Sequence, residues 1–444
     1  MKKLLLIIAL CLPLLAGAKT GENAGKIHFI EYDLDNGLHV ILQQDHTTPN
    51  VIVSVMYHVG SKNENPQLTG FAHFFEHLMF EGSDNIKRGE YPNYVTQAGG
   101  RLNANTAFDR TYYFEMLPSN ELALGLWLES ERMLHPTIQP IGIKTQKDVV
   151  CQEMQQTRDN QPYGRILTEM LKNSYTVHPY KHDVLGSEEH IRSASDQDFI
   201  DFHDKFYVPN NAVLTVVGDF EVASAKQMIH DYFNDIPKGA PVQQPPMNEP
   251  AKTGEVRAVA YDNIQLPALL YGFHTPAMTS PDSYAVQMLS TLLSDGESSR
   301  LYSAIVSDQQ LALQLASIPL PMEHPGLMII LGLPNNGKSL EDLEKSIDTE
   351  IAKVQTDLIS DEEFRKLQNK VELDIVNSFS TISGKAQNLA DAYTYYKNTN
   401  LVNETLDKYL AVTKEDIRNA ARKYLAKSNR TVLYYLPNSE KTNK

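Results

Sequence analysis

The sequence predicts an α+β protein built from two domains, each a mixed sheet packed with helices. Strand-like and helix-like stretches alternate along the chain. A proline-rich stretch at 236–255 divides the 444 residues into halves of similar length. Each half also ends in a helical run followed by a strand, at 198–217 and at 416–435. We therefore expect one domain fold used twice, at 26–235 and at 256–440, with residues 236–255 as the linker.

The elements of the first half follow in order from its patterns. Strands are expected at 29–32, 38–42 and 51–57, the first two joined by an Asn-Gly turn. An apolar helix within 68–80 comes next, and Thr69 is its expected N-cap. A hairpin of strands at 102–106 and 111–115 follows the Gly99-Gly100 turn. Helices at 123–133 and 147–156, a buried strand at 212–219 and a helix at 222–232 complete the first domain.

Composition and charge exclude several classes of function. Hydrophobic residues make up 42% and charged residues 21% of the chain, as in a globular protein with a substantial core. The formal net charge is −15 at pH 7. An acidic protein of this kind is not expected to bind nucleic acid or anionic membrane surfaces.

The N-terminus has the pattern of a signal peptide at residues 1–18. Two lysines precede an apolar run at 4–15, and Ala16-Gly17-Ala18 offers a cleavage site before Lys19. This run is too short to span a bilayer, so we expect an exported protein, periplasmic in a Gram-negative cell, without stable membrane insertion. A lipoprotein anchored through Cys11 is disfavoured by Leu10. After cleavage Cys151 is the single cysteine, so no intramolecular disulfide is expected.

The sequence His73-Phe74-Phe75-Glu76-His77 is the main chemical motif of the chain. In a helix, with about 100° per residue, His77 lies about 40° from His73 and Glu76 about 60° away on the other side. Two imidazoles one turn apart can bind one ion, and the carboxylate beside them can reach a water molecule. Burying these three groups without partners would be costly, so the motif indicates a metal site.

Spacing alone leaves the third protein ligand open. The acidic candidates downstream are Glu115, Glu129, Glu131, Asp148 and Glu153, and the histidines are His178 and His182, for which a solvated loop is the preferred interpretation. Cys151 lies about 200° from Glu153 on a helix and cannot share an ion with it, so we interpret Cys151 as a buried apolar residue.

The wider pattern resembles the pitrilysin/insulinase family of zinc peptidases, whose metal motif has the order His-x-x-Glu-His. Gly60-Ser61, Gly70 to His73, Glu76-His77, Phe80 and Gly82 fit that family, as do Gly99-Gly100, Asn103-Ala104, Thr106, Asp109 and Thr111. The resemblance covers about residues 26–437. The length is similar to that of half-size bacterial members and of the mitochondrial processing peptidase subunits, so the resemblance implies two homologous α/β-roll domains that form one half of a clamshell chamber.

The resemblance also implies roles for individual residues. One Zn²⁺ per chain would be bound by His73, His77 and Glu153, although the same ligand set also accepts cobalt or manganese. Glu76 would be the general base, and Asn103 and Ala104 would contact the backbone of a peptide that adds itself as a strand. Gln146 stands where many relatives have a glutamate that supports the third ligand.

A second departure from the family concerns partners. Active relatives carry an arginine and, seven residues later, a tyrosine that hold the substrate. Met328 stands at the corresponding arginine position, and no arginine after the linker has a tyrosine seven residues on. A heterodimer with a homologous subunit carrying this pair is therefore expected, with a homodimer as the alternative.

The function expected from these observations is zinc-dependent endopeptidase activity on peptides or unfolded polypeptides in an exported compartment. The alternative is a non-catalytic binding or scaffold subunit of a peptidase-like complex, against which the intact Glu76 argues. A zinc hydrolase acting on other substrates is disfavoured by the edge-strand motif. Substrate, cleavage preference and partner identity do not follow from the sequence.

Overall fold

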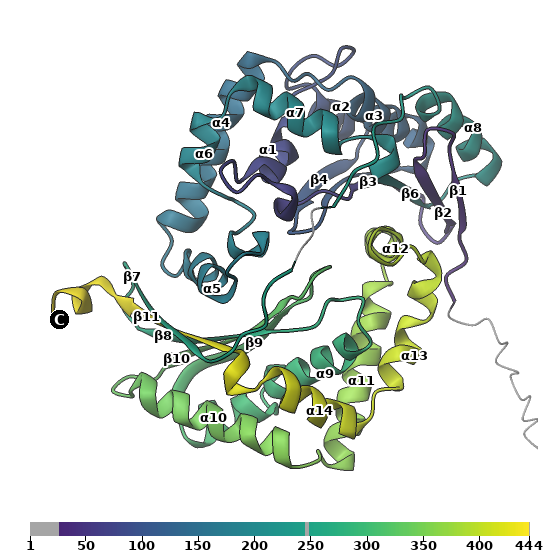
Figure 1. Ribbon diagram of the computed structural model, residues 1–444. Helices are drawn as coiled ribbons and strands as arrows, with labels where there is room; N and C mark the ends of the chain where they lie inside the picture. Colours follow the sequence, from purple (N-terminus) through teal and green to yellow (C-terminus); the bar gives the residue numbers. More distant parts are fainter. Residues whose placement is uncertain (1–25, 245–247, 444) are drawn as a thin grey trace, which may run out of the picture.

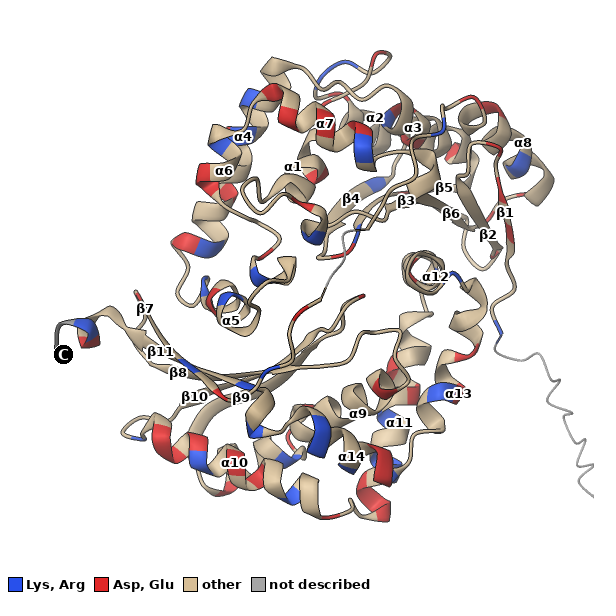
Figure 2. Cartoon of the chain, in the orientation of Figure 1, with Lys and Arg blue, Asp and Glu red and all other residues tan. Residues whose placement is uncertain are grey.

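The computed structural model describes residues 26–244 and 248–443 (Figure 1). The predicted signal peptide and part of the predicted linker, 245–247, lie outside the described residues. Within the described ranges, no helix has the length and apolar character needed to cross a bilayer. Figure 2 shows acidic and basic residues interspersed along α4, α6 and α10, with no basic face gathered in this view.

The first half forms a six-stranded mixed sheet with the strand order β1-β2-β6-β3-β5-β4. Its strands are β1 (Ile30–Asp33), β2 (His39–Gln44), β3 (Asn50–Tyr57), β4 (Arg101–Thr106), β5 (Thr111–Pro118) and β6 (Ala212–Gly218). The strands predicted in this half are all present. Strand β4 lies at one edge of the sheet, next to β5.

The second half forms a five-stranded sheet with the order β7-β11-β8-β10-β9. Its strands are β7 (Val256–Asp262), β8 (Ala268–His274), β9 (Ala312–Leu320), β10 (Leu327–Pro334) and β11 (Arg430–Pro437). Strand β11 runs parallel to β7, and β6 runs parallel to β2, whereas the other pairs are antiparallel. Apart from β1, the two sheets therefore share one topology, in which the first and last strands of each half pair in parallel. The predicted α+β fold used twice is confirmed.

The described helices lie mostly on the outer faces of the two sheets. Those of the first half are α1 (Phe71–Leu78), α2 (Tyr91–Gln97), α3 (Leu122–Leu134), α4 (Pro140–Met154), α5 (Ile166–Ser174), α6 (Glu188–Ser193), α7 (Asp196–Phe206) and α8 (Val222–Phe233). Those of the second half are α9 (Asp282–Ser294), α10 (Leu340–Thr356), α11 (Asp361–Ser378), α12 (Ile382–Tyr396), α13 (Thr405–Leu410) and α14 (Lys414–Tyr424).

Each half contributes one helix that packs on the inner face of the other half's sheet. Helix α12, from the second half, packs on the inner face of the first sheet through Leu389, Ala390 and neighbouring apolar residues. Helix α5, from the first half, packs on the inner face of the second sheet through Met170 and Leu171. Figure 1 shows α12 on the side of the first sheet opposite α1, and α5 between the sheets. Each half therefore completes the core of the other.

A buried polar cluster also joins the halves. The loop between β9 and β10 brings Glu323 to His58, with Oε2 2.7 Å from His58 Nε2, and into an ion pair with Lys62. Lys62 Nζ lies 3.1 Å from Asp109 Oδ1, and its side chain is fully buried. Burial favours the neutral carboxyl, but the partners His58 and Lys62 outweigh it and lower the pKa of Glu323 to about 2.

Candidate metal centre

Helix α1 positions the histidines because its apolar side is anchored in the core. Phe71, Phe74, Phe75 and Leu78 are buried, and the Phe74 and Phe75 rings contact aromatic residues of α7. These contacts fix the rotation of the helix about its axis. His73, Glu76 and His77 are left in the sector predicted from the helical period.

The start of α1 differs from the prediction. Its N-cap is Gly70, in the left-handed region with φ 96°, and no side chain of the cap residue accepts a hydrogen bond. Instead, the Glu64 carboxylate accepts the backbone N–H groups of Gly70 and Ala72, both at 2.8 Å. The predicted cap, Thr69, interacts with His190 Nδ1 at 2.9 Å. Burial raises the pKa of Glu64 to about 8, against the lowering effect of these two hydrogen bonds.

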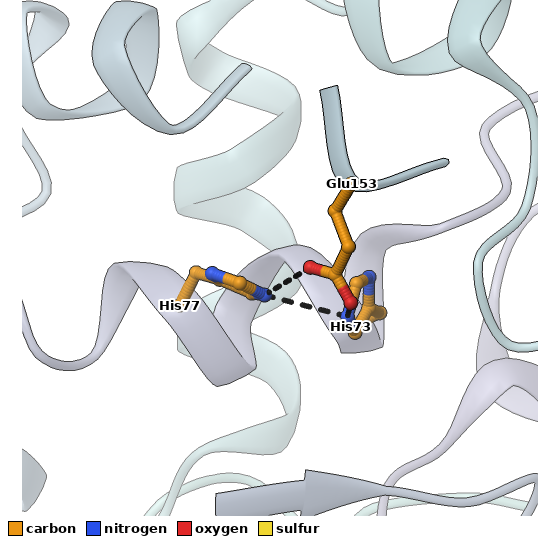
Figure 3. A group of neighbouring side chains, drawn as sticks. All are labelled: His73, His77 and Glu153. Carbon is orange, nitrogen blue, oxygen red and sulfur yellow. Dashed lines mark hydrogen bonds and ion pairs between the residues drawn. The ribbon is translucent and has the colours of Figure 1, made fainter. Parts of the chain in front are cut away.

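Helix α4 brings Glu153 to the two histidines. His73 Nε2 lies 3.6 Å from Glu153 Oε1, His77 Nε2 lies 3.1 Å from Glu153 Oε2, and the two Nε2 atoms lie 3.4 Å apart (Figure 3). Hydrogen bonding to His73 and His77 lowers the pKa of the Glu153 carboxyl. Among the described residues, this is the one group of three or more such side chains with ligand atoms close enough to share an ion.

The donor set and its spacing fit zinc. Ligand atoms about 2.0–2.1 Å from a tetrahedral zinc ion lie about 3.3 Å from one another. The separations of 3.1 Å from His77 Nε2 to Glu153 Oε2 and of 3.4 Å between the two Nε2 atoms are close to that value, and His73 Nε2 lies 3.6 Å from the other carboxylate oxygen, Oε1. Both histidines present the same ring atom, Nε2, to the shared point, and Glu153 approaches from a different helix. If these three side chains bind the ion, one tetrahedral position stays open, as in catalytic zinc sites.

The other candidates for the third ligand lie elsewhere. Glu115 and Glu129 form buried ion pairs with Arg132, each at 3.1 Å. Glu131 accepts hydrogen bonds from Ser83 and Asn85. Asp148 pairs with Arg192, and His182 contacts the backbone oxygen of Asp183. The solvated position predicted for His178 is wrong, because His178 is buried and accepts the backbone N–H of Tyr180. Cys151 is buried in the core, as predicted.

Glu76 is half-buried and lies outside the group of three. Its Oε2 accepts a hydrogen bond of 2.7 Å from the Thr106 hydroxyl, at the end of β4. Sequence reasoning assigned no role to Thr106 beyond the family pattern. Side chains alternate between the two faces of a strand, so Leu102, Ala104 and Thr106 of β4 lie on the face toward α1. This alternation could have indicated a role for Thr106.

The free edge of β4 follows from the hairpin. The Ala107 N–H donates to the Arg110 carbonyl, and the next pair toward the sheet is Thr106 with Thr111. Antiparallel pairs alternate, so Asn103 and Asn105 bond to β5, whereas the backbone groups of Ala104 and Thr106 face away from it. The backbone N–H of Ala104 donates instead to the side-chain carbonyl of Asn103, 3.0 Å away. The Ala104 side chain itself is buried.

Among the hydrogen bonds of the described residues, none joins Gln146 to Glu153. Gln146 Nε2 donates to Glu81 Oε1 at 2.6 Å, and Glu81 also pairs with Arg88. Since Glu81 follows α1 by one turn, this hydrogen bond connects α4 to the segment after α1. Met328, at the expected arginine position, is fully buried in the core under the outer helices of the second sheet.

Comparisons with known proteins agree with this arrangement. Residues 39–188 match the family model described as insulinase (peptidase family M16), and residues 193–371 match the model of the peptidase M16 inactive domain. A zinc protease of Helicobacter pylori, PqqE, is 28% identical over 408 residues, covering 91% of this chain and 92% of its own.

Solved structures share the fold. The crystal structure of a protease from Helicobacter pylori matches with a TM-score of 0.89 and 27% identity, over 93% of this chain and all of its own. The periplasmic protease PqqL of Escherichia coli matches with a TM-score of 0.76 at 16% identity, over 94% of this chain but 48% of its own. The present chain thus has the fold of about half of that longer protein.

Proposed function

Because the chain belongs to the insulinase family of peptidases, family M16, we propose that it is a zinc-dependent endopeptidase that hydrolyses peptides or unfolded polypeptides. The observation that carries this proposal is the convergence of His73, His77 and Glu153 from two helices, with Glu76 one residue from His77. Names of relatives such as the zinc protease of Helicobacter pylori support zinc as the metal.

In this proposal His73 and His77, through Nε2, and one oxygen of Glu153 hold one zinc ion per chain. The bound ion supplies Lewis-acid chemistry, which activates water at neutral pH and polarises the scissile carbonyl. Gln146 supports the centre indirectly, by fixing α4 to the segment after α1 through Glu81.

The residues of the chain perform the proton transfers and the positioning. Glu76 accepts a proton from the attacking water and returns it to the leaving amine. The free edge of β4 offers backbone donors and acceptors to an extended peptide, which adds as a further strand. Asn103 and Ala104 are the proposed contacts to the peptide backbone.

We further propose that a second chain completes the chamber. Two observations support this: the chain corresponds in fold to about half of a longer protease, and it lacks the expected arginine–tyrosine pair. A heterodimer with a homologous subunit that carries the pair is proposed, with a homodimer as the alternative. A fully active homodimer, purified from native cells without another chain, would contradict the heterodimer.

We also propose the limits of the two domains and the cellular compartment of the protein. We place the zinc-binding domain at 26–235 and the second domain at 256–440, with the linker at 236–255. The described residues between α8 and β7 contain no helix or strand, which supports this division. Export to a periplasm is supported by the signal-peptide pattern at residues 1–18.

The test compares the wild type with Glu76→Gln and with Glu90→Gln, an exposed glutamate at the start of α2. Each protein is assayed on a quenched peptide library, and its zinc content is measured. We expect Glu76→Gln to retain one zinc and to lose at least about 100-fold in kcat, and Glu90→Gln to match the wild type. One bound zinc without cleavage, both in the isolated chain and in native preparations, would refute the peptidase proposal and favour the scaffold alternative.

A further inference from the structure

Thr106 connects two parts of the site that otherwise belong to different elements. Its hydroxyl donates to Glu76 Oε2, on α1, across 2.7 Å. Its backbone lies at the free edge of β4, because Thr106 and Thr111 form a pair without ladder hydrogen bonds. One residue therefore contacts the proposed base and lies where the proposed peptide strand would add.

The hydrogen bond restricts the Glu76 carboxylate. Within residues 26–244 and 248–443, no other hydrogen bond reaches this carboxylate. The carboxylate is half-buried, and a hydroxyl donor to an ionised oxygen forms one of the stronger hydrogen bonds in proteins. Holding Oε2 limits rotation of the group and leaves Oε1 to accept a proton.

The position of Thr106 is itself well fixed. Two residues earlier on the same face of β4, Ala104 is buried in the core beneath α1. The cross-strand neighbour Thr111 is fully buried and donates its hydroxyl to the Val59 carbonyl at 2.9 Å. The distance between the edge strand and the base is therefore set by the sheet.

We propose that Thr106 is a positioning residue for catalysis: its hydroxyl orients the base Glu76, and its place on β4 sets that base against the bound peptide. This inference rests on the proposed peptidase function. Serine, which keeps the hydroxyl, should substitute for threonine, whereas valine, which keeps the shape, should not.

The experiment measures kcat, KM, zinc content and thermal unfolding for the wild type, Thr106→Val, Thr106→Ser and Thr111→Val. We expect Thr106→Val to lower kcat by roughly 10- to 100-fold, the effect of losing one hydrogen bond to a charged group, with KM within about twofold and one zinc retained. Thr106→Ser should retain most of the wild-type kcat. Thr111→Val removes a hydroxyl at the paired position, so it should lower stability and leave kcat within about threefold.

A double variant tests whether Thr106 acts through Glu76. In the Glu76→Gln background, adding Thr106→Val should cause no further loss. The proposal is overturned if Thr106→Val retains the wild-type kcat, if Thr106→Ser falls as far as Thr106→Val, if Thr111→Val matches the loss, or if zinc is lost. A zinc-loaded wild type without peptidase activity would be a different result, since it refutes the proposed function before any variant is compared.

Discussion

The Asn103 side-chain carbonyl accepts the backbone N–H of Ala104 across 3.0 Å, at the free edge of β4. In the proposed function an incoming peptide strand would use this N–H, so the Asn103 contact satisfies this donor when no peptide is bound. Exposed strand edges are sites of unwanted pairing, and such a contact reduces that risk. Substrate addition would replace one acceptor by another.

Proline substitutions separate the free edge from the ladder. Ala104→Pro removes an N–H that is not part of the β4–β5 ladder, so we expect little loss of stability but at least about a tenfold loss in kcat/KM, mainly through KM. Asn103→Pro removes a ladder donor and leaves its acceptor on β5 unpaired, so it should instead lower the free energy of unfolding by roughly 1–3 kcal/mol. Peptide kinetics and denaturant unfolding of both variants provide the check. Equal kinetic behaviour of Ala104→Pro and the wild type would exclude strand addition at this edge.

Removing the third ligand should release the metal. For Glu153→Ala we expect at least about a 100-fold weaker zinc affinity, because two neutral imidazoles on one helix turn cannot complete the site. Gln152→Ala, at the exposed neighbouring position, is the control and should bind one zinc as the wild type does. Competition with a fluorescent chelator measures both affinities. If Glu153→Ala binds zinc with unchanged affinity, Glu153 is not the third ligand.

The cap of α1 should contribute to stability. Glu64→Ala leaves the Gly70 and Ala72 N–H groups without their acceptor, and we expect the free energy of unfolding to fall by roughly 2–3 kcal/mol. Glu90→Ala is the matched control, because Glu90 occupies the N-cap of α2 but accepts no capping hydrogen bond. Urea unfolding of the metal-free proteins measures the difference. If the two alanine variants unfold alike, Glu64 does not stabilise the helix.

The contact between the halves should depend on pH through Glu323. Its pKa in the folded protein, about 2, is below the ordinary glutamate value of 4.5. A carboxyl with a depressed folded pKa stabilises the protein above its unfolded pKa, and this contribution is lost as the pH falls toward 2. Glu323→Gln should therefore lower the free energy of unfolding at pH 7 by up to about 3 kcal/mol, because one unit of pKa shift corresponds to about 1.4 kcal/mol.

The measurement is denaturant unfolding of the wild type and Glu323→Gln between pH 7 and pH 3.5. The difference in free energy of unfolding between the two proteins should be largest at neutral pH and should become smaller below about pH 4.5. Glu362→Gln, an exposed position on α11, should show no such difference. If the difference in free energy of unfolding stays constant across this pH range, titration of Glu323 is not its cause.

Features that depend on local geometry can be predicted from the sequence alone. The positions of His73, Glu76 and His77 on one sector follow from the helical period, and the strands of the first half follow from their apolar, β-branched runs and the turns between them. The repeated domain was visible in the recurring helix–strand pattern and in the proline-rich linker. These features require no knowledge of how distant segments meet.

Which distant groups meet depends on how the elements pack in the folded protein. Glu153 reaches the histidines because α4 docks beside α1, and the same docking directs Gln146 to Glu81. Glu64 caps α1 in place of Thr69, and Thr106 reaches Glu76 across two elements. The exchange of α5 and α12 between the sheets has no local pattern either. Each depends on packing between segments far apart in the chain, where several partners have equal local propensity and only the folded core selects among them.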